Sequence, residues 1–391
     1  MRQNFISLNE LMLRRGGSVE PSKYPDEEFE LYSIPAFDRA KSEITPGREI
    51  GSSKQLLQSG DVLLSKIVPH IRRSWIVGPS QGKRIVGSGE WIVFRAPDFH
   101  AEYLRQVLVG DQFHSEFMRT VSGVGGSLLR ARPVHVAKIR IPLPPLAEQR
   151  RIAAILDEAD GLRTRRRASL AELDTLLQST FLQMFGDPVT NPMGWEMGTL
   201  ESLGRVQGGL QVTTRRKSLP LGRPYLRVAN VYRGRLELSE IKTIRLTEDE
   251  ARRTTLEAED ILIVEGHGNP GEIGRCARWN GAIEGCVHQN HLIRFRCDRS
   301  VVNPVYIEAY LNSEGGRREL LGTARTTSGL NTISVKKVKL SCVFLPPLVL
   351  QRQFAAIVES VDAQKARMRA HLAELDTLFA SLQAAAFQGE L

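Results

Sequence analysis

The stretch LPPLAEQRRIAAILDEADGLRTRRRASLAELDTLLQSTFLQMF, residues 143–185, occurs a second time as LPPLVLQRQFAAIVESVDAQKARMRAHLAELDTLFASLQAAAF, residues 345–387. The two copies align at a constant offset of 202 positions without a gap, and 22 of the 43 positions are identical. Chance does not produce this much identity over such a length. The chain is therefore an internal duplication of one unit of about 200 residues.

Each copy is predicted to form one long helix. The paired prolines Pro144-Pro145 and Pro346-Pro347 end any preceding element, and the second proline of each pair is compatible with a first helical turn. Gly161 is the single helix-weakening residue in the first copy. A helix of about 40 residues is roughly 60 Å long.

An apolar residue recurs every seven positions in the second copy, and in the first copy the same repeat is interrupted at Arg166. Such a repeat is typical of helices that pack along a narrow stripe. In the second copy this row is Phe354, Val361, Met368, Leu375 and Leu382, and the predicted companion row is Ile357, Gln364, His371, Leu378 and Ala385, with Leu372 and Phe379 beside it. In the first copy the rows are Ile152, Ala159, Leu173 and Ile155, Leu162, Leu176. We expect the two copies to pack antiparallel against each other; the alternative is that each helix lies on its own globular segment.

The composition indicates a soluble globular protein with a polyanionic partner. The chain has 391 residues, 41% hydrophobic and 25% charged, with neither a signal-peptide core nor an apolar run near the ~20 residues of a membrane span. Its net charge is +9 and its pI is about 9.5. The cysteines are Cys276, Cys286, Cys297 and Cys342, none in a C-x-x-C pair, so we expect no zinc site or disulfide and a reducing cytoplasm.

The duplication predicts four parts: globular segments at 1–143 and 187–345, and helices at 144–186 and 346–391. In the first segment, strands are expected at 29–38, 60–68, 73–78, 84–89, 90–97 and 136–143, with a helix over 98–121 broken at Gly110. The second segment repeats this order, with strands expected at 224–234, 259–266 and 291–297 and a helix from Asn303 to Leu321.

The sequence carries no recognisable catalytic constellation. The run Gly266–Gly271 matches G-x-G-x-x-G, but Pro270, Gly271 and Gly274 exclude the helix that would hold a pyrophosphate. Glu240-Ile241-Lys242 has the tail of a nuclease motif without a well-placed Pro-Asp before it. We therefore predict a non-catalytic protein without a cofactor or metal of its own.

Polar and basic loops at matching places in both segments predict a nucleic-acid face. Arg, Asn, Gln and His read base edges, whereas Ser, Thr and backbone N–H groups contact phosphates. For any single loop, solvent exposure explains such residues equally well. In the second segment the candidate DNA-contacting residues are Thr213, Thr214, Arg215, Arg216, Lys217, Arg227, Asn230, Tyr232, Arg233, His267, Asn269, His288, Gln289, Asn290, Thr326, Thr327, Ser328 and Asn331. In the first segment they are Lys66, His70, Arg72, Arg73, Ser127 and Arg130.

The chain resembles the specificity subunit (HsdS) of type I restriction–modification systems. The resemblance rests on the two LPPL-x-x-QR-x-x-AAI stretches (143–155 and 345–357) and on the two LAELDTL heptads (170–176 and 372–378). It rests also on the runs YLRVANVYRG (225–234) and TTSGLNTISVKKVKL (326–340).

The resemblance implies an α+β fold, in which an antiparallel pair of long coiled-coil helices separates two target-recognition domains related by a pseudo-twofold repeat. Each domain would read one half of a gapped, asymmetric site in double-stranded DNA. The helices would bind two methyltransferase (modification) subunits, and restriction/translocase subunits would join for cleavage. S-adenosylmethionine, ATP and magnesium would belong to those partners. The alternatives are the recognition part of a fused or type II-like restriction–methylation enzyme, and a coiled-coil scaffold without a DNA role.

Overall fold

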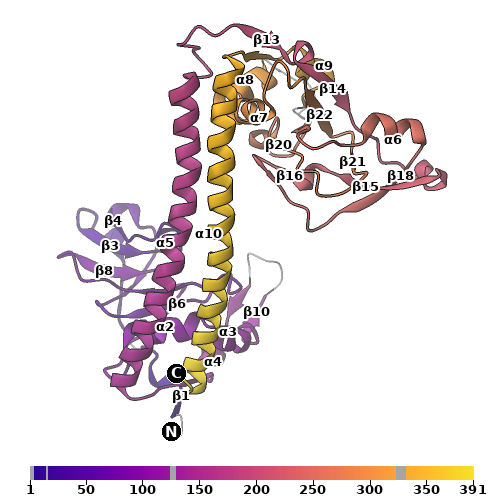
Figure 1. Ribbon diagram of the computed structural model, residues 1–391. Helices are drawn as coiled ribbons and strands as arrows, with labels where there is room; N and C mark the ends of the chain where they lie inside the picture. Colours follow the sequence, from indigo (N-terminus) through magenta and orange to yellow (C-terminus); the bar gives the residue numbers. More distant parts are fainter. Residues whose placement is uncertain (1–3, 15, 124–128, 323–331) are drawn as a thin grey trace. The chain divides into compact units, whose positions relative to one another are not determined.

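The computed structural model describes residues 4–14, 16–123, 129–322 and 332–391. It divides into two compact units: unit 1 comprises residues 1–167 and 370–391, and unit 2 comprises residues 168–369. Two long helices, α5 (Leu146–Phe185) and α10 (Leu348–Gln388), each contribute residues to both units (Figure 1). None of the helices that the structure describes combines the length and apolarity of a membrane span.

The duplicated stretches form the two long helices, as predicted. The carbonyl groups of Pro145 and Pro347 accept hydrogen bonds from the N–H groups of Gln149 and Gln351, at 3.0 and 3.2 Å. The second proline of each pair therefore lies directly before the helix instead of inside its first turn. Gly161 is accommodated within α5 without a break.

Within each unit the segments of α5 and α10 run antiparallel. In unit 2, the Lys365 ammonium donates to the Asp174 carboxylate at 2.6 Å. In unit 1, the Arg163 guanidinium donates to Asp376 at 2.6 Å and lies 4.3 Å from the centre of the Phe379 ring. Charged side chains therefore occupy the helix–helix contact together with apolar ones.

The predicted companion row of the heptad was wrong by one residue. In α10 the row that packs beside Phe354 and Val361 is Val358, Lys365, Leu372, Phe379 and Ala386. Ile357 and Leu378 are 37% and 48% exposed, and in α5 Leu162 and Leu176 are 41% and 49% exposed. A helical stripe can step by three or by four residues, and apolar residues stand at both spacings here. The sequence pattern alone therefore did not select the row.

Unit 1 holds a five-stranded sheet of order β2-β5-β8-β3-β4 and a three-stranded sheet of order β7-β6-β9. The bounds of these strands are β2 Ser18–Val19, β3 Glu28–Tyr32, β4 Glu43–Pro46, β5 Lys54–Leu56, β6 Val62–Ser65, β7 Ser74–Ile76, β8 Arg84–Gly87 and β9 Trp91–Phe94. Two small sheets pair β1 (Phe5–Ser7) with β12 (Arg140–Pro142) and β10 (Val121–Ser122) with β11 (Arg130–Ala131). The helices are α1 Ile34–Asp38, α2 Ala101–Val109, α3 Asp111–Met118 and α4 Pro133–Val136.

Unit 2 holds a four-stranded sheet of order β14-β22-β19-β20 and a three-stranded sheet of order β18-β15-β21. The bounds of these strands are β14 Gly204–Gly208, β15 Leu221–Leu226, β18 Lys242–Leu246, β19 Ile261–Val264, β20 Cys276–Arg278, β21 Val287–His288 and β22 Leu292–Cys297. Two small sheets pair β13 (Met197–Thr199) with β23 (Cys342–Phe344) and β16 (Val231–Tyr232) with β17 (Arg235–Leu236). The helices are α6 Glu248–Thr254, α7 Pro304–Asn312, α8 Glu314–Leu321 and α9 Val335–Leu340.

Most of the predicted elements of the first segment are present, including the helix broken at Gly110 into α2 and α3. The strand predicted over 29–38 stops at Tyr32, because the Ser33 hydroxyl caps α1 by accepting from the Ala36 N–H at 3.0 Å. The strand predicted over 136–143 is limited to β12, since the preceding turn is α4.

A buried glutamine in the first turn of each long helix ties that helix to its globular segment. The Gln351 Oε1 accepts from the Asn303 N–H at 2.8 Å, and its Nε2 donates to the Pro346 carbonyl at 2.8 Å. Gln149 makes the equivalent bonds to the His100 N–H at 2.7 Å and to the Pro144 carbonyl at 2.8 Å. Both side chains are 1% exposed. His100 and Asn303 cap α2 and α7, so one amide joins two helix starts in each unit.

A buried ion pair is also repeated. The Asp61 carboxylate binds the Arg95 guanidinium through both oxygens, at 2.5 and 2.6 Å, and accepts from the Gln58 N–H. Asp260 binds Arg296 in the same way, at 2.7 Å through both oxygens. The two globular segments therefore share a framework, although their sequences differ more than those of the helices do.

Replacing Gln351 by Leu should lower the free energy of unfolding of unit 2 by about 2–4 kcal/mol, because two buried backbone groups lose their partners. Denaturant unfolding followed by circular dichroism measures the change. Gln353→Leu is the matched control, since Gln353 lies on the same helix but is exposed. Equal stability of the two variants would contradict the anchoring role of Gln351.

Candidate nucleic-acid interface

The polar loops of unit 2 meet at one edge of the four-stranded sheet. Strand β14 ends at Gly208 and β19 ends at Val264, and β22 begins between them at Leu292. The registers Gly208↔Ile293 and Val264↔Leu292 place these three strand ends side by side. The loops 209–217, 265–271 and 288–291 therefore leave the sheet from a common edge.

Two further segments reach the same edge. Strand β15 pairs in parallel with β21, with Leu226 opposite His288, so the loop that begins at Arg227 starts beside it. Thr332 bridges Gly266, which brings the start of the 332–334 segment before α9 to this edge as well. At Gly209 a side chain is excluded, because its Cβ would lie 2.2 Å from the Gln289 carbonyl oxygen.

Unit 1 repeats the arrangement around β6 and β9. Ser65, at the end of β6, pairs with Trp91 at the start of β9. The loop that follows β6 is bound to the segment around Arg130 by the Ile67↔Arg130 bridge and by the Ala131 N–H, which donates to the Lys66 carbonyl at 2.8 Å. The matching loops of the two sequence repeats thus occupy matching strand ends.

The predicted residues differ widely in exposure. Thr213, Thr214, Arg215, Lys217, Tyr232, Arg233, Asn269, His70, Arg72 and Arg130 are exposed, and Lys66, Arg216, Arg227, His267, Gln289 and Asn290 are half-buried. Five predicted residues lie outside the described residues: Ser127, Thr326, Thr327, Ser328 and Asn331.

Several of the accessible basic side chains already have ion-pair partners. Arg216 binds both oxygens of Glu250 at 2.9 Å, Arg227 lies 2.6 Å from Glu240, and Arg130 lies 3.0 Å from Glu90. Each of these arginines would have to exchange a carboxylate for a DNA group, whereas Arg215 and Lys217 have no ion-pair partner among the described residues.

Three predicted residues are buried and cannot touch a base in this conformation. Asn230, 2% exposed, holds its own turn: its Oδ1 accepts from the Arg227 N–H, and its Nδ2 donates to the carbonyls of Glu237 and Glu240. Arg73, 8% exposed, binds both oxygens of Asp38 at 2.8 and 3.1 Å. His288 is completely buried. These three side chains are therefore inaccessible to DNA in this conformation.

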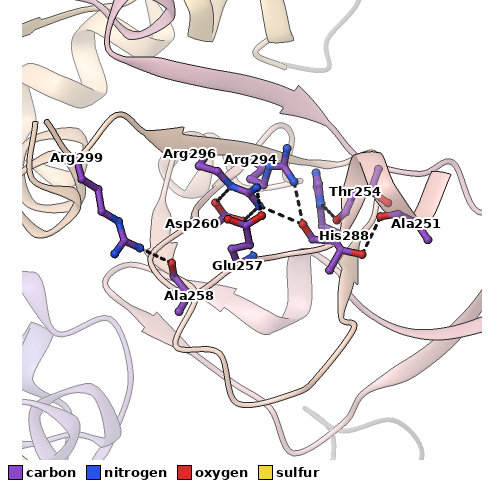
Figure 2. A network of polar contacts seen from close by, with 10 residues as sticks. Ala251, Thr254, Glu257, Ala258, Asp260, His288, Arg294, Arg296 and Arg299 are labelled. Carbon is purple, nitrogen blue, oxygen red and sulfur yellow. Dashed lines mark hydrogen bonds and ion pairs between the residues drawn. The ribbon is translucent and has the colours of Figure 1, made fainter. Parts of the chain in front are cut away.

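The His288 imidazole belongs to an internal polar network (Figure 2). Its ring nitrogens lie 3.3 Å from the Thr254 carbonyl and 3.4 Å from the Gln207 carbonyl. Burial and then the neighbouring Arg294 guanidinium lower the pKa of His288 to about 4, so the ring is neutral at pH 7. A neutral ring carries one N–H and can donate to only one of these two carbonyls, so His288 supports the loop edge through a single hydrogen bond.

Sequence reasoning missed two arginines that the fold brings beside Tyr232 and Arg233. Arg275 precedes β20 and lies 4.8 Å from the centre of the Tyr232 ring, and Arg317 lies in α8. Both Arg233 and Arg317 donate to the Gly271 carbonyl, at 3.4 and 2.7 Å. No local motif marks either missed residue, because their proximity depends on the packing of α8 against the 265–275 loop. Among the described residues, no group of three or more His, Cys, Asp and Glu side chains is placed to hold a metal ion.

The low pKa of His288 predicts a pH-dependent stability. The unfolded chain binds a proton near pH 6.5 and the folded chain only near pH 4, so stability is full above pH 6.5 and falls as the pH drops towards 4. Between pH 7.5 and 5 the wild type should lose about 2 kcal/mol more than His288→Gln. Urea unfolding at both pH values measures this difference; parallel losses in the two proteins would contradict it.

The chain is similar in sequence to two curated restriction subunits. It is 27% identical over 289 residues to the type I restriction enzyme EcoKI specificity subunit of Escherichia coli (strain K12), covering 68% of this chain and 61% of that protein. It is 27% identical over 326 residues to the StySPI specificity subunit of Salmonella potsdam, covering 76% of this chain and 66% of that protein. The chain thus spans less than two thirds of the length of either relative. No family model matches it.

Two solved structures have a similar fold. The first comes from work on complex assembly and conformational transition of the type I R-M system; its chain is 21% identical, with a TM-score of 0.63 and coverage of 100% of this chain and 99% of that one. The second is the S subunit of a type I restriction–modification system from M. genitalium, 13% identical, with a TM-score of 0.54 and coverage of 99% and 96%. The resemblance predicted from sequence is confirmed: the chain is similar in sequence to type I restriction enzyme specificity subunits and has a mixed helix-and-sheet fold like that of a solved S subunit.

Proposed function

We propose that this chain is the non-catalytic DNA-recognition subunit of a type I restriction–modification complex. The observation that carries the proposal is the repeated loop edge: in both units, basic and polar loops leave matching strand ends. One such edge on each repeat suits a protein that reads two half-sites with different residues. The similarity to two specificity subunits supports the same conclusion.

The proposed division of labour follows the duplication. Residues 1–143 and 187–345 would be target-recognition domains, each reading one half of a gapped, asymmetric site. Residues 144–186 and 346–391 would be the spacer helices that separate them. Direct readout would fall to accessible side chains such as Arg227, Gln289 and Asn290, and phosphate contacts to Arg215 and Lys217.

The outer faces of the spacer helices suit partner subunits. Exposed apolar side chains at Leu162, Leu176, Leu182, Ile357 and Leu378 are from 37% to 51% exposed, and they lie outside the α5–α10 contact. Apolar residues repeated along a helix and left uncovered are typical docking positions for another helix. We assign them to two methyltransferase subunits, which would carry S-adenosylmethionine. Restriction/translocase subunits would bring ATP and magnesium.

Deleting the gene should abolish modification at one gapped DNA motif throughout the host genome, while the purified chain alone neither methylates nor cuts DNA. Methylome sequencing with and without the gene tests the first part. A pure-protein assay with S-adenosylmethionine, ATP and magnesium tests the second. An unchanged methylome would argue against the recognition role, and turnover without partners would favour the fused-enzyme alternative.

Lengthening both spacer helices equally should lengthen the gap of the site without changing its halves. Duplicating residues 167–173 in α5 and 368–374 in α10 adds one heptad to each helix, or roughly 10 Å. The ion pairs Arg167–Asp376 and Lys365–Asp174 lie near this level, so the two insertions face each other. With base pairs about 3.4 Å apart, the modified motif should gain roughly three base pairs of gap.

The control for this insertion is the same heptad placed in α5 alone. That variant puts the two helices out of register and should be inactive. If the paired insertion keeps the original gap, or if it changes the bases read in either half, the helices do not set the spacing.

A further inference from the structure

We propose that Arg233 and Arg317 of unit 2 form an anchoring site for one phosphate of the DNA backbone. The buried Arg275, 4% exposed, is a supporting positive charge beside Arg233. The proposal rests on the DNA-recognition role proposed above and assigns a specific role to the end of the 265–271 loop, where Arg233 and Arg317 meet. The three side chains come from the turn after β16, the start of β20 and α8, so no single segment reveals the site.

The Arg233 and Arg317 guanidinium groups converge on one backbone carbonyl, whereas Arg275 donates to the Val228 carbonyl at 3.1 Å. Arg317 donates to the Gly271 oxygen at 2.7 Å and Arg233 donates to the same oxygen at 3.4 Å. Arg233 also donates to the carbonyl of Asn312, the last residue of α7, at 3.2 Å. Two guanidinium groups that share one neutral acceptor repel each other, and a bound anion would relieve that repulsion.

Counter-charge at this cluster is low. Glu272 pairs with Arg275 at 2.6 Å, whereas neither Arg233 nor Arg317 forms an ion pair within the part of the chain that the structure describes. Within the same residues, the buried Nε atoms of Arg275 and Arg317 lack hydrogen-bond partners. Burial and the nearby Arg317 lower the pKa of Arg233. A phosphate, with several acceptor oxygens, satisfies forked donors of this kind.

Unit 1 shows that the fold does not require the excess charge. At the matching helix junction, Arg72 donates to the carbonyl of Val109, the last residue of α2, at 3.1 Å. There, however, Asp111 at the start of α3 neutralises Arg72 at 2.6 Å. His114, the fourth residue of α3, takes the place that Arg317 holds as fourth residue of α8. The same junction thus forms with a neutralised arginine in one unit and an unneutralised pair in the other.

The aromatic neighbour makes the site more specific for a nucleic-acid backbone. Tyr232 is 37% exposed, and the guanidinium carbons of Arg235 and Arg275 lie 4.7 and 4.8 Å from its ring centre. These cation–π contacts hold the arginine planes in place and leave the phenol hydroxyl available to a phosphate oxygen or a sugar.

The test is binding of the full chain to a short random-sequence duplex at several salt concentrations. The double substitution Arg233→Gln with Arg317→Gln should weaken binding by about three- to thirty-fold at low salt, and should reduce the slope of log affinity against log salt by about 1. The matched control, Arg252→Gln with Arg318→Gln, removes the same charge from exposed arginines paired with Asp249 and Glu314 and should leave both quantities unchanged.

A variant in the opposite direction covers the case in which the double substitution does not fold. Glu272→Gln removes the counter-charge and should raise both the affinity, about two- to three-fold, and the salt slope. If the wild type binds the duplex but neither the folded double variant nor Glu272→Gln differs from it, the anchor is wrong while the recognition role stands. If the wild type does not bind duplex DNA at any salt concentration, the recognition role itself fails, and the anchor with it.

Discussion

The rest of the structure depends on a glutamine side chain that occurs at the same place in both repeats. Gln149 and Gln351 lie buried in the first turns of α5 and α10, and each holds both the start of its own helix and the N-terminus of a helix in the globular segment. Helix starts leave N–H groups without partners, and burying them unpaired would be costly. A single glutamine satisfies one such group and so fixes the helix on its segment.

This role explains why the helix-entry stretch is one of the well-matched parts of the duplication. The glutamine acts only if the prolines before it present a carbonyl at the right place and if the apolar residues after it bury the amide. Sequence around Pro346 and Gln351 is therefore constrained by geometry. The loop sequences are constrained mainly at the positions where the loops join their strands.

Sequence analysis predicted the secondary structure better than it predicted which polar side chains are accessible. The long helices, the repeat and most strands follow from periodicity and breaker residues, which are local properties. Polar side chains are harder to assign, since Asn230 and His288 have the chemistry of base readers but serve internal carbonyls and amides. The pattern placed Leu372 and Phe379 beside the predicted companion row, but the choice of row and the cluster around Arg317 depend on packing between distant segments, which local patterns do not reveal.

The charged residues in the α5–α10 contact have a consequence for how firmly the helices are aligned. An apolar stripe repeating every seven residues would tolerate a slip of one heptad, because leucine would again meet leucine. Lys365 does not tolerate it: its side chain is only 10% exposed and is neutralised by Asp174. Arg167 lies seven residues before Asp174 and Phe181 lies seven residues after it. A slip of one heptad would therefore place the Lys365 ammonium beside a like charge in one direction and beside an aromatic ring in the other. The Lys365–Asp174 pair therefore fixes the register of the two helices, because it permits only one of the alignments that the apolar stripe alone would allow.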